Sequence, residues 1–489
     1  MLIKKNDFFY VLLAIAASAL GVVAIGNPNA PVGLYGLLGL VGIALIMTII
    51  IKPSFGAWIL ILAIFTNISD NLTNRGYPGL IKPLVMVVAL ALLVHYIYTE
   101  QRPEGRSKTR RIEMFLFLYF LVVSISFIVA SNKDRALAQI VDLVKDIGII
   151  YCILFALRQF ESWKLAVWVI ILSATFLCLL EMYQIITSNY GQTFMGLAAV
   201  QMEKVFETSY TPRLSGPVNE PNVWGLVLVA VIPLVIYRIF HERLTLVKFL
   251  CVAILGLLLV IIFNTYSRGA YVGLVIIIGL IMLEKRLKAL AVFGGFGLFV
   301  ILILVLPSKY LERFQTLTLL SPTSQNGIYQ DSSFRGRGSE VLTGLRMFYE
   351  HPLLGVGAGN YNNNYQQYAQ LIGIEYRNEE REPHSLYVQL LAETGILGTI
   401  AFLGIVVSLL GGLDKSIKAI KHLPSGQAWL PWISAIRLSI IAYLVSSLFL
   451  HMAYIRYFWI LVALALSAIQ ITNDLLNNSQ KAKSLGVQS

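Results

Sequence analysis

Long apolar runs, separated by short polar segments, follow one another along most of the chain. Most of these runs have about 20 residues, the length of helix that crosses ~30 Å of hydrocarbon. The alternation of apolar and polar residues that is typical of a membrane-spanning β-strand does not recur along the chain. The pattern therefore predicts an all-α polytopic membrane protein.

We expect about 12 to 14 transmembrane helices, because the run at 55–69 is short and the run at 137–157 contains charged residues. The runs are 8–25, 32–51, 55–69, 80–98, 113–131, 137–157, 163–186, 222–240, 247–264, 269–284, 287–306, 386–412, 428–450 and 453–474. The first run resembles a signal peptide, but it continues to Ile25 and is followed by further spans. We therefore expect an uncleaved first helix.

Basic residues in the loops orient these helices. Lys and Arg gather in alternate loops, at 102–111, 238–248, 285–288 and 415–421. Loops rich in Lys and Arg stay on the cytoplasmic side. We therefore expect a multi-pass protein of the inner (cytoplasmic) membrane, with both termini in the cytoplasm and its large loop in the periplasm.

This topology divides the chain into alternating membrane and loop segments. They are N-terminal transmembrane helices (1–186), a first outer loop (187–221), central transmembrane helices (222–306), a large periplasmic loop (307–385), C-terminal transmembrane helices (386–474) and a cytoplasmic tail (475–489). The large loop carries seven basic and eight acidic residues. Because these charges nearly cancel, particular arginines rather than a long-range field must give the loop any affinity for anions. We also expect a helix over Ser339–Tyr349, with Val341, Leu342, Leu345 and Phe348 as its apolar face.

Composition supports a membrane protein and excludes other classes. The chain is 57% hydrophobic and only 13% charged, whereas soluble domains have about 25% charged residues. The net charge of +12 is spread over short loops rather than over one basic face, so we expect no nucleic-acid partner. The three cysteines lie within apolar runs and are predicted to be small core residues.

Arg213, Arg268 and Arg337 come from three separate segments on the predicted outer side. An arginine at a membrane interface often serves only as an anchor. Three that converge would instead form a clamp for phosphate oxygens. The clamp would suit a lipid-linked pyrophosphate, whose tail lies in the bilayer while its phosphates sit at the surface. Guanidinium groups there would also stabilise a leaving group that gains negative charge.

His384 lies just before an apolar helix and follows an acidic run that contains Glu379, Glu380 and Glu382. Two roles are open for it. It can be a surface hydrogen-bonding residue, or a neutral imidazole that takes a proton from a sugar hydroxyl as general base. In the second case, the neighbouring carboxylates can hold or tune the ring.

Tyr361, Tyr365 and Tyr368 are four and three residues apart, which places three rings on one helical face. The rings can pack the loop or stack on sugars. We place Tyr361 and Tyr365, together with Arg268 and Asn222, among the candidate substrate-binding residues.

The sequence contains no recognisable site for a metal or a nucleotide. It has no His-x-x-x-His pair, and its outer acids form no compact Asp-x-Asp arrangement. The Gly355-x-Gly357-x-Gly359 turn follows no strand and lacks a Gly-Lys-Ser/Thr element. We therefore expect no metal and no cofactor.

Two other classes of function remain open. Asp142 and Asp146 lie within a predicted span, and buried carboxylates can carry protons or ions in a transporter of a polysaccharide precursor or a small anion. Lys145 beside them can equally pair with them locally. The halves of the chain do not repeat each other, as those of many transporters do. A scaffold within a polysaccharide assembly complex is the third possibility.

Four segments resemble the O-antigen ligase and O-antigen polymerase superfamily in order and spacing, over roughly 205–405. They are Arg213-Leu-Ser-Gly216 followed by Pro221-Asn222; Thr265-Tyr-Ser-Arg-Gly269; Arg337-x-x-x-Val341 followed by Pro352 and Leu-Leu-Gly-Val-Gly; and His384-Ser385 followed by Gly395-x-x-Gly398. Val341 stands where the family often has Trp or Leu, a departure that should affect packing only.

The resemblance implies a metal-independent, inverting membrane glycosyltransferase of the GT-C-like architecture. Such enzymes take a glycan from an undecaprenyl-pyrophosphate donor on the outer face of the inner membrane. By motif, Arg213 and Arg337 would hold the pyrophosphate and His384 would assist the attack, which makes these three the catalytic candidates. The acceptor is either another glycan, as for a polymerase, or a lipid or protein, as for a ligase.

Overall fold

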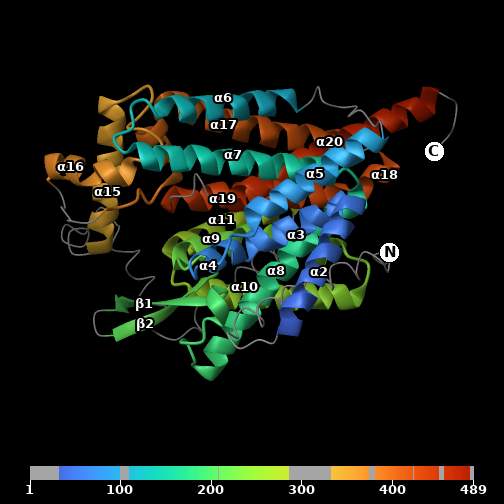
Figure 1. Cartoon of the computed structure of the whole chain (residues 1–489), viewed down its shortest axis with the longest axis horizontal. Coiled ribbons are helices and arrows are strands. Elements are labelled where there is room, and N and C mark those ends of the chain that lie inside the picture. The colour runs from blue at the N-terminus through green and yellow to red at the C-terminus, as the bar shows by residue number, and fades with distance from the viewer. Residues whose placement is uncertain are drawn as a thin grey trace.

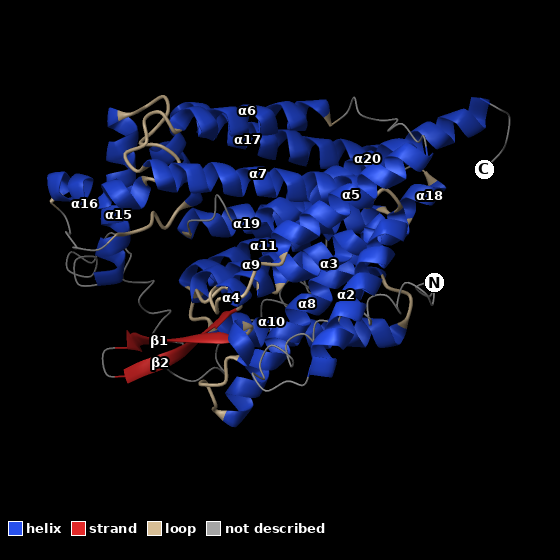
Figure 2. Cartoon of the chain, in the orientation of Figure 1, coloured by secondary structure: helices blue, strands red, loops and turns tan. Residues whose placement is uncertain are grey.

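The computed structural model describes residues 32–99, 109–206, 209–285, 332–373, 380–421, 423–450 and 456–484. Helices dominate this part of the chain (Figure 1, Figure 2). They are α2 (Val32–Ile51), α3 (Pro53–Phe65), α4 (Ile68–Thr73), α5 (Ile81–Thr99), α6 (Arg110–Ser126), α7 (Lys133–Ala156), α8 (Phe160–Thr187), α9 (Pro221–His241), α10 (Thr245–Asn264), α11 (Arg268–Lys285), α15 (Ser332–Glu350), α16 (Tyr361–Ile372), α17 (Leu386–Ile420), α18 (Pro424–Gln427), α19 (Leu430–Ser446) and α20 (Arg456–Ser484). Two strands, β1 (Ala199–Phe206) and β2 (Ser209–Gly216), form a hairpin.

Within the described residues, six helices are long and apolar enough to cross a membrane. They are Phe160–Thr187, Pro221–His241, Thr245–Asn264, Leu386–Ile420, Leu430–Phe449 and Arg456–Gln480. The predicted class, an all-α polytopic membrane protein, is thereby confirmed. The predicted spans at 8–25 and 287–306 lie outside the described residues, so the total number of spans stays a prediction.

The short predicted span at 55–69 is a helix that ends early. α3 stops at Phe65, and Asn67 then adopts a left-handed backbone with φ of 48°. The Asn67 side chain donates to Pro217 O at 3.1 Å, and Asn71 of α4 donates to Gly196 O at 3.0 Å. The run is therefore interrupted because its polar end docks on the segment that carries the hairpin.

We call the end of the molecule that carries the hairpin, α15 and α16 the loop end (Figure 1). There α15 runs across the direction of α6, α7 and α17, whereas those three helices run side by side (Figure 1). The hairpin was not predicted. β2 buries Thr211, Arg213 and Ser215 at alternate positions, and because these side chains are polar they produce no hydrophobic alternation.

α17 has a break in its helical backbone at Gly395, where φ is 62°. The turn after α15 binds the carbonyl groups next to this break. Val356 N donates to Ala392 O at 2.8 Å, and Gly357 N donates to Glu393 O at 3.1 Å. Buried carbonyl groups require partners, so the glycine-rich turn and the broken helix hold each other in place.

α15 contains the predicted helix, but its buried face differs from the predicted one. Leu342 and Leu345 are 42% and 41% exposed, whereas Glu340, Gly344 and Met347 are buried. Glycine is required at 344 because a Cβ there would overlap the side chain of Val388 in α17. Close approach to α17 and burial of a carboxylate therefore decide the orientation of α15, and not the apolar spacing.

Candidate functional site

Arg213 projects from β2 into the protein at the loop end, where its side chain is 4% exposed. Its Nε donates to Thr265 O at 2.8 Å and its Nη2 donates to Asn222 Oδ1 at 2.9 Å. Its Nη1 forms an ion pair with Glu203 of β1. All three guanidinium nitrogens are thus bound by the protein. Asn222, a predicted substrate-binding residue, orients Arg213 through this hydrogen bond.

A fully buried carboxylate on α8 fixes the segment that carries Arg213. Glu181 Oε1 accepts from Gly216 N at 3.0 Å, and its Oε2 accepts from Trp224 Nε1 at 2.9 Å. Gly216 has φ of +55°, and a Cβ there would overlap the Trp224 ring. Sequence reasoning missed Glu181, although an acidic residue within a predicted span is itself a signal of a functional or structural role.

Arg268 is the first residue of α11 and is half-buried. The chain reaches it through a tight turn in which Tyr266 has φ of 51°. Ser267 Oγ then accepts from Ala270 N at 3.3 Å, as the capping side chain of a helix N-terminus does. The turn also supplies the carbonyl oxygen of Thr265 to Arg213, so Arg213 and Arg268 occupy one corner of the site.

Arg337 of α15 completes the group of arginines. Burial lowers the pKa of its guanidinium, and the positive charges of Arg268 and Arg213 lower that pKa further, whereas Glu340 and Glu220 raise it. Arg268 and Arg213 therefore both lie within electrostatic reach of Arg337. Arg337 donates no hydrogen bond to the part of the chain that the structure describes.

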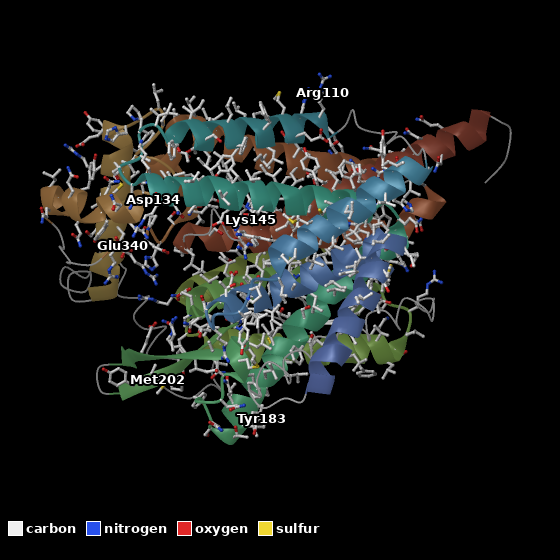
Figure 3. All side chains as sticks on the ribbon, in the orientation of Figure 1. Arg110, Asp134, Lys145, Tyr183, Met202 and Glu340 are labelled. Atoms are coloured by element: carbon white, nitrogen blue, oxygen red, sulfur yellow. The ribbon has the colours of Figure 1, made fainter. Side chains whose placement is uncertain are left out.

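His384 lies beside a buried carboxylate of α15. Its Nδ1 is 2.6 Å from Glu340 Oε2, and Glu340 Oε1 is 3.4 Å from Arg381 Nη1. The Glu340 side chain is 1% exposed, whereas that of His384 is 25% exposed. A neutral imidazole that donates from Nδ1 carries its free lone pair on Nε2. Glu340, labelled in Figure 3, lies three residues from Arg337 on α15, so the imidazole and the arginine group belong to one site.

The carboxylate at His384 Nδ1 comes from α15, outside the acidic run. The sequence left open whether the carboxylates of that run hold the ring, and Glu380 of the run forms an ion pair with Arg135 of α7 at 2.7 Å. Glu379 lies outside the described residues. Glu340 and His384 are 44 residues apart in sequence, and their contact depends on the packing of α15 against α17.

Tyr361 and Tyr365 do not offer rings to a sugar. They are 0% and 1% exposed and pack with Met347 and Val356 in a small core at the loop end. Burial leaves no ring face for stacking, so the structure supports the other predicted role, packing of the loop. Tyr361 also donates its hydroxyl to Glu340 O, which ties α16 to the helix turn that holds His384.

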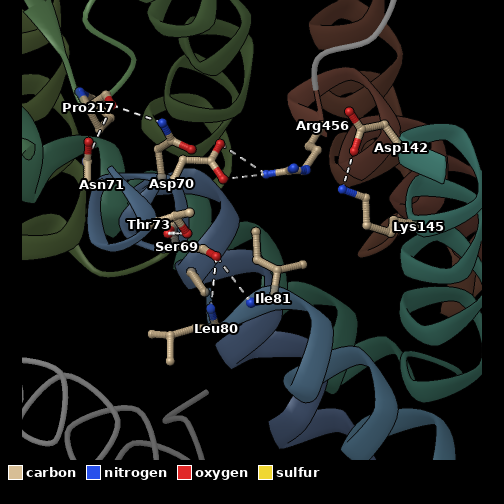
Figure 4. Close-up of polar contacts among 12 residues, drawn as sticks. Ser69, Asp70, Asn71, Thr73, Leu80, Ile81, Asp142, Lys145, Pro217 and Arg456 are labelled. Carbon is tan, nitrogen blue, oxygen red and sulfur yellow. Dashed lines mark hydrogen bonds and ion pairs between the residues drawn. The ribbon is translucent and has the colours of Figure 1, made fainter. Parts of the chain in front are cut away.

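The two carboxylates of the transporter hypothesis, Asp142 and Asp146, differ in their surroundings; Figure 4 shows the Asp142–Lys145 pair and the nearby Asp70–Arg456 pair. Asp142 pairs with Lys145, one turn away on α7. Asp146 lies 3.9 Å from Arg456 Nε of α20, and Arg456 Nη1 lies 3.2 Å from Asp70 of α4. These contacts link α4, α7 and α20. Among the described residues, no group of three or more His, Cys, Asp or Glu side chains could hold a metal ion.

Comparison with known protein families identifies the stretch that contains most of this site. Residues 253–403 match the family described as O-antigen ligase. The chain contains an O-antigen ligase domain. The match confirms the resemblance seen in the sequence and shows a membrane enzyme of the O-antigen ligase or polymerase type. Comparison with curated proteins gives no match.

The O-antigen ligase domain holds Arg268, Arg337 and His384, whereas Arg213 and Asn222 precede the matched residues. The hairpin and the start of α9 therefore complete the arginine group from outside the domain. Four of the predicted site residues, the three arginines and His384, come together at the loop end.

Proposed function

We propose that this protein transfers a glycan from an undecaprenyl-pyrophosphate donor to a hydroxyl group of an acceptor glycan or lipid. The reaction takes place at the periplasmic face of the inner membrane, where the loop end lies, and it requires no metal. Arg337 and Arg268 bind the pyrophosphate directly. Arg213, held by the protein through all three nitrogens, contributes positive charge from the wall of the site.

In the transfer step, the acceptor oxygen attacks the anomeric carbon of the donor sugar. Its proton passes to Nε2 of His384, and the resulting imidazolium is stabilised by Glu340 at Nδ1. The bond between the anomeric carbon and the pyrophosphate oxygen breaks, and undecaprenyl pyrophosphate leaves with the electron pair. Arg337 and Arg268 stabilise the charge that develops there. Attack from the face opposite the leaving group inverts the configuration of the sugar.

One observation carries this proposal. The Glu340 carboxylate, 2.6 Å from His384 Nδ1, sits three residues from Arg337 on the same helix. One rigid element therefore positions both the group that receives a proton and a guanidinium that binds the leaving group. A transporter would not need an imidazole oriented by a buried carboxylate.

The test is glycan transfer by the full-length protein in proteoliposomes. Lipid-linked glycan from the producing cells serves as donor, and the same glycan, released by mild acid and end-labelled, serves as acceptor. We expect one free undecaprenyl pyrophosphate for each new glycosidic bond, with the anomeric configuration inverted. Movement of intact donor or glycan across the membrane without bond formation would support the transporter hypothesis instead.

Glu203 occupies a position on Arg213 that a phosphate oxygen could take. Replacing Glu203 by Gln removes the negative charge, so we expect the KM for the donor to fall roughly two- to fivefold, the range for a half-exposed ion pair. Glu242→Gln is the matched control, because Glu242 pairs with Arg238 at 3.2 Å in another part of the chain. A rise in the donor KM would show that Glu203 positions Arg213 for the donor rather than competing with it.

A further inference from the structure

α16 has two faces of different chemistry. One face buries Tyr361, Tyr365, Tyr368 and Ala369 in the small core of the loop end. The opposite face carries Asn363, Gln366, Gln367 and Gln370. Their spacing of three, four and seven residues from the first places them in one row along the helix. We call these four residues the amide stripe.

The amide stripe belongs to a helix without charge. None of the twelve residues of α16 is Asp, Glu, Lys or Arg, although about a quarter of the residues in soluble domains are charged. Asn363 donates to Ser131 Oγ at 3.0 Å. Gln366, Gln367 and Gln370 make no hydrogen bond to the described part of the chain. Each amide can donate two hydrogen bonds and accept others.

This chemistry fits a ligand rich in hydroxyl groups. A hydroxyl group both donates and accepts, and so does the amide of Gln. A phosphate or carboxylate ligand would call for Arg or Lys, and a lipid surface would call for a row of apolar and basic side chains. The stripe runs over the eight residues 363–370, or about 10 Å of helix, which is the length of a disaccharide. An uncharged glycan is the ligand class that these side chains suit.

The buried face of α16 connects the stripe to His384. Tyr361 donates its hydroxyl to Glu340 O, and Tyr365 Oη lies 3.4 Å from Ser339 Oγ. Both contacts are to the turn of α15 that holds the imidazole. α16 itself lies beyond α15, outside the helix bundle and away from the hairpin that carries Arg213 (Figure 1). The helix that carries the stripe is therefore anchored to the turn of α15 that holds His384, with the stripe on its outward face.

We propose that the amide stripe of α16 binds the sugar residues of the acceptor, so that the acceptor is a glycan or carries one. This inference rests on the proposed glycosyl transfer and adds the identity of the acceptor-binding surface. The stripe holds the chain of the acceptor glycan while its terminal hydroxyl group reaches His384. It makes no contact with the pyrophosphate.

The test is a triple variant, Gln366→Ala with Gln367→Ala and Gln370→Ala, in the full-length protein in proteoliposomes. The acceptor probe is the end-labelled, acid-released glycan of the producing cells. With the hydrogen bonds of three amides lost, we expect the acceptor KM to rise about tenfold, while the donor KM and the kcat at saturating acceptor stay unchanged. Gln192→Ala is the matched control, because Gln192 is an exposed amide of the 187–221 segment.

Two outcomes of the kinetic test would overturn the proposal. An acceptor KM equal to that of the wild type would show that the stripe does not bind the acceptor. A rise in the donor KM instead would assign the stripe to the donor glycan.

A direct measurement of glycan binding distinguishes the proposal that the stripe binds the acceptor from the proposal of glycosyl transfer. His384→Ala should bind the labelled glycan as the wild type does, and adding the triple variant should weaken that binding about tenfold. Stripe-dependent binding by a wild-type protein that transfers nothing would refute glycosyl transfer alone. Equal binding with and without the stripe would refute the stripe alone, and an unchanged unfolding temperature of the triple variant shows that it is folded.

Discussion

Replacing His384 by Ala is expected to lower the kcat of glycan transfer by about 10² to 10⁴, the contribution typical of a positioned general base. The acceptor hydroxyl would then have to lose its proton to water. The amount of protein in the membrane should not change, because the His384 side chain is partly exposed. Initial rates at saturating donor and acceptor, normalised to the folded protein, give the result.

Glu340 should act through His384, and a double-variant comparison tests this. Glu340→Gln alone should give a loss smaller than that of His384→Ala, because the ring remains but is no longer held by a charge. Adding Glu340→Gln to His384→Ala should cost nothing further, since residues that act as a unit are not additive. His351→Ala, an exposed histidine of the same loop, serves as control. Additive losses would show that Glu340 has a separate role.

The helices of the bundle could be predicted because the length and composition of a single run of residues are enough to identify a membrane span. A run such as 222–240 has the length and composition of a span whatever lies beside it, and α9 covers it. The break of α17 at Gly395 and the burial of the Glu340 face of α15 could not be predicted in this way. Both depend on a contact between two segments, which no single run of residues records.

The residues of the candidate site likewise include some that could be predicted from the sequence and some that could not. Arg268, Arg337 and His384 could be predicted, because arginine and histidine side chains next to apolar runs are rare and cost free energy to bury. Glu181 and Glu340 were missed, since each contacts a group that is 35 or 44 residues away in sequence. The tyrosines were correctly placed on one helical face, but periodicity cannot say whether that face is buried or offered to a ligand.

Arg337 is the arginine whose removal should weaken catalysis most. Its guanidinium donates no hydrogen bond within the described residues, whereas Arg213 is bound through all three of its nitrogens. We therefore expect Arg337→Ala to lower kcat by about 10² to 10³, as the loss of a donor aimed at developing charge does. Rates of release of undecaprenyl pyrophosphate at saturating donor measure this.

The pair of variants Arg337→Ala and Arg337→Lys separates charge from geometry. Lysine restores the positive charge but not the two parallel N–H groups that bind phosphate oxygens, so we expect it to recover only part of the lost rate. Arg346→Ala is the matched control, because Arg346 lies on the same helix, is 49% exposed and pairs with Glu350 at 2.7 Å. If Arg337→Ala transferred glycan at the wild-type rate, the leaving group would have to be stabilised elsewhere. The proximity of Arg337 to Arg213 and Arg268 would then play no part in catalysis.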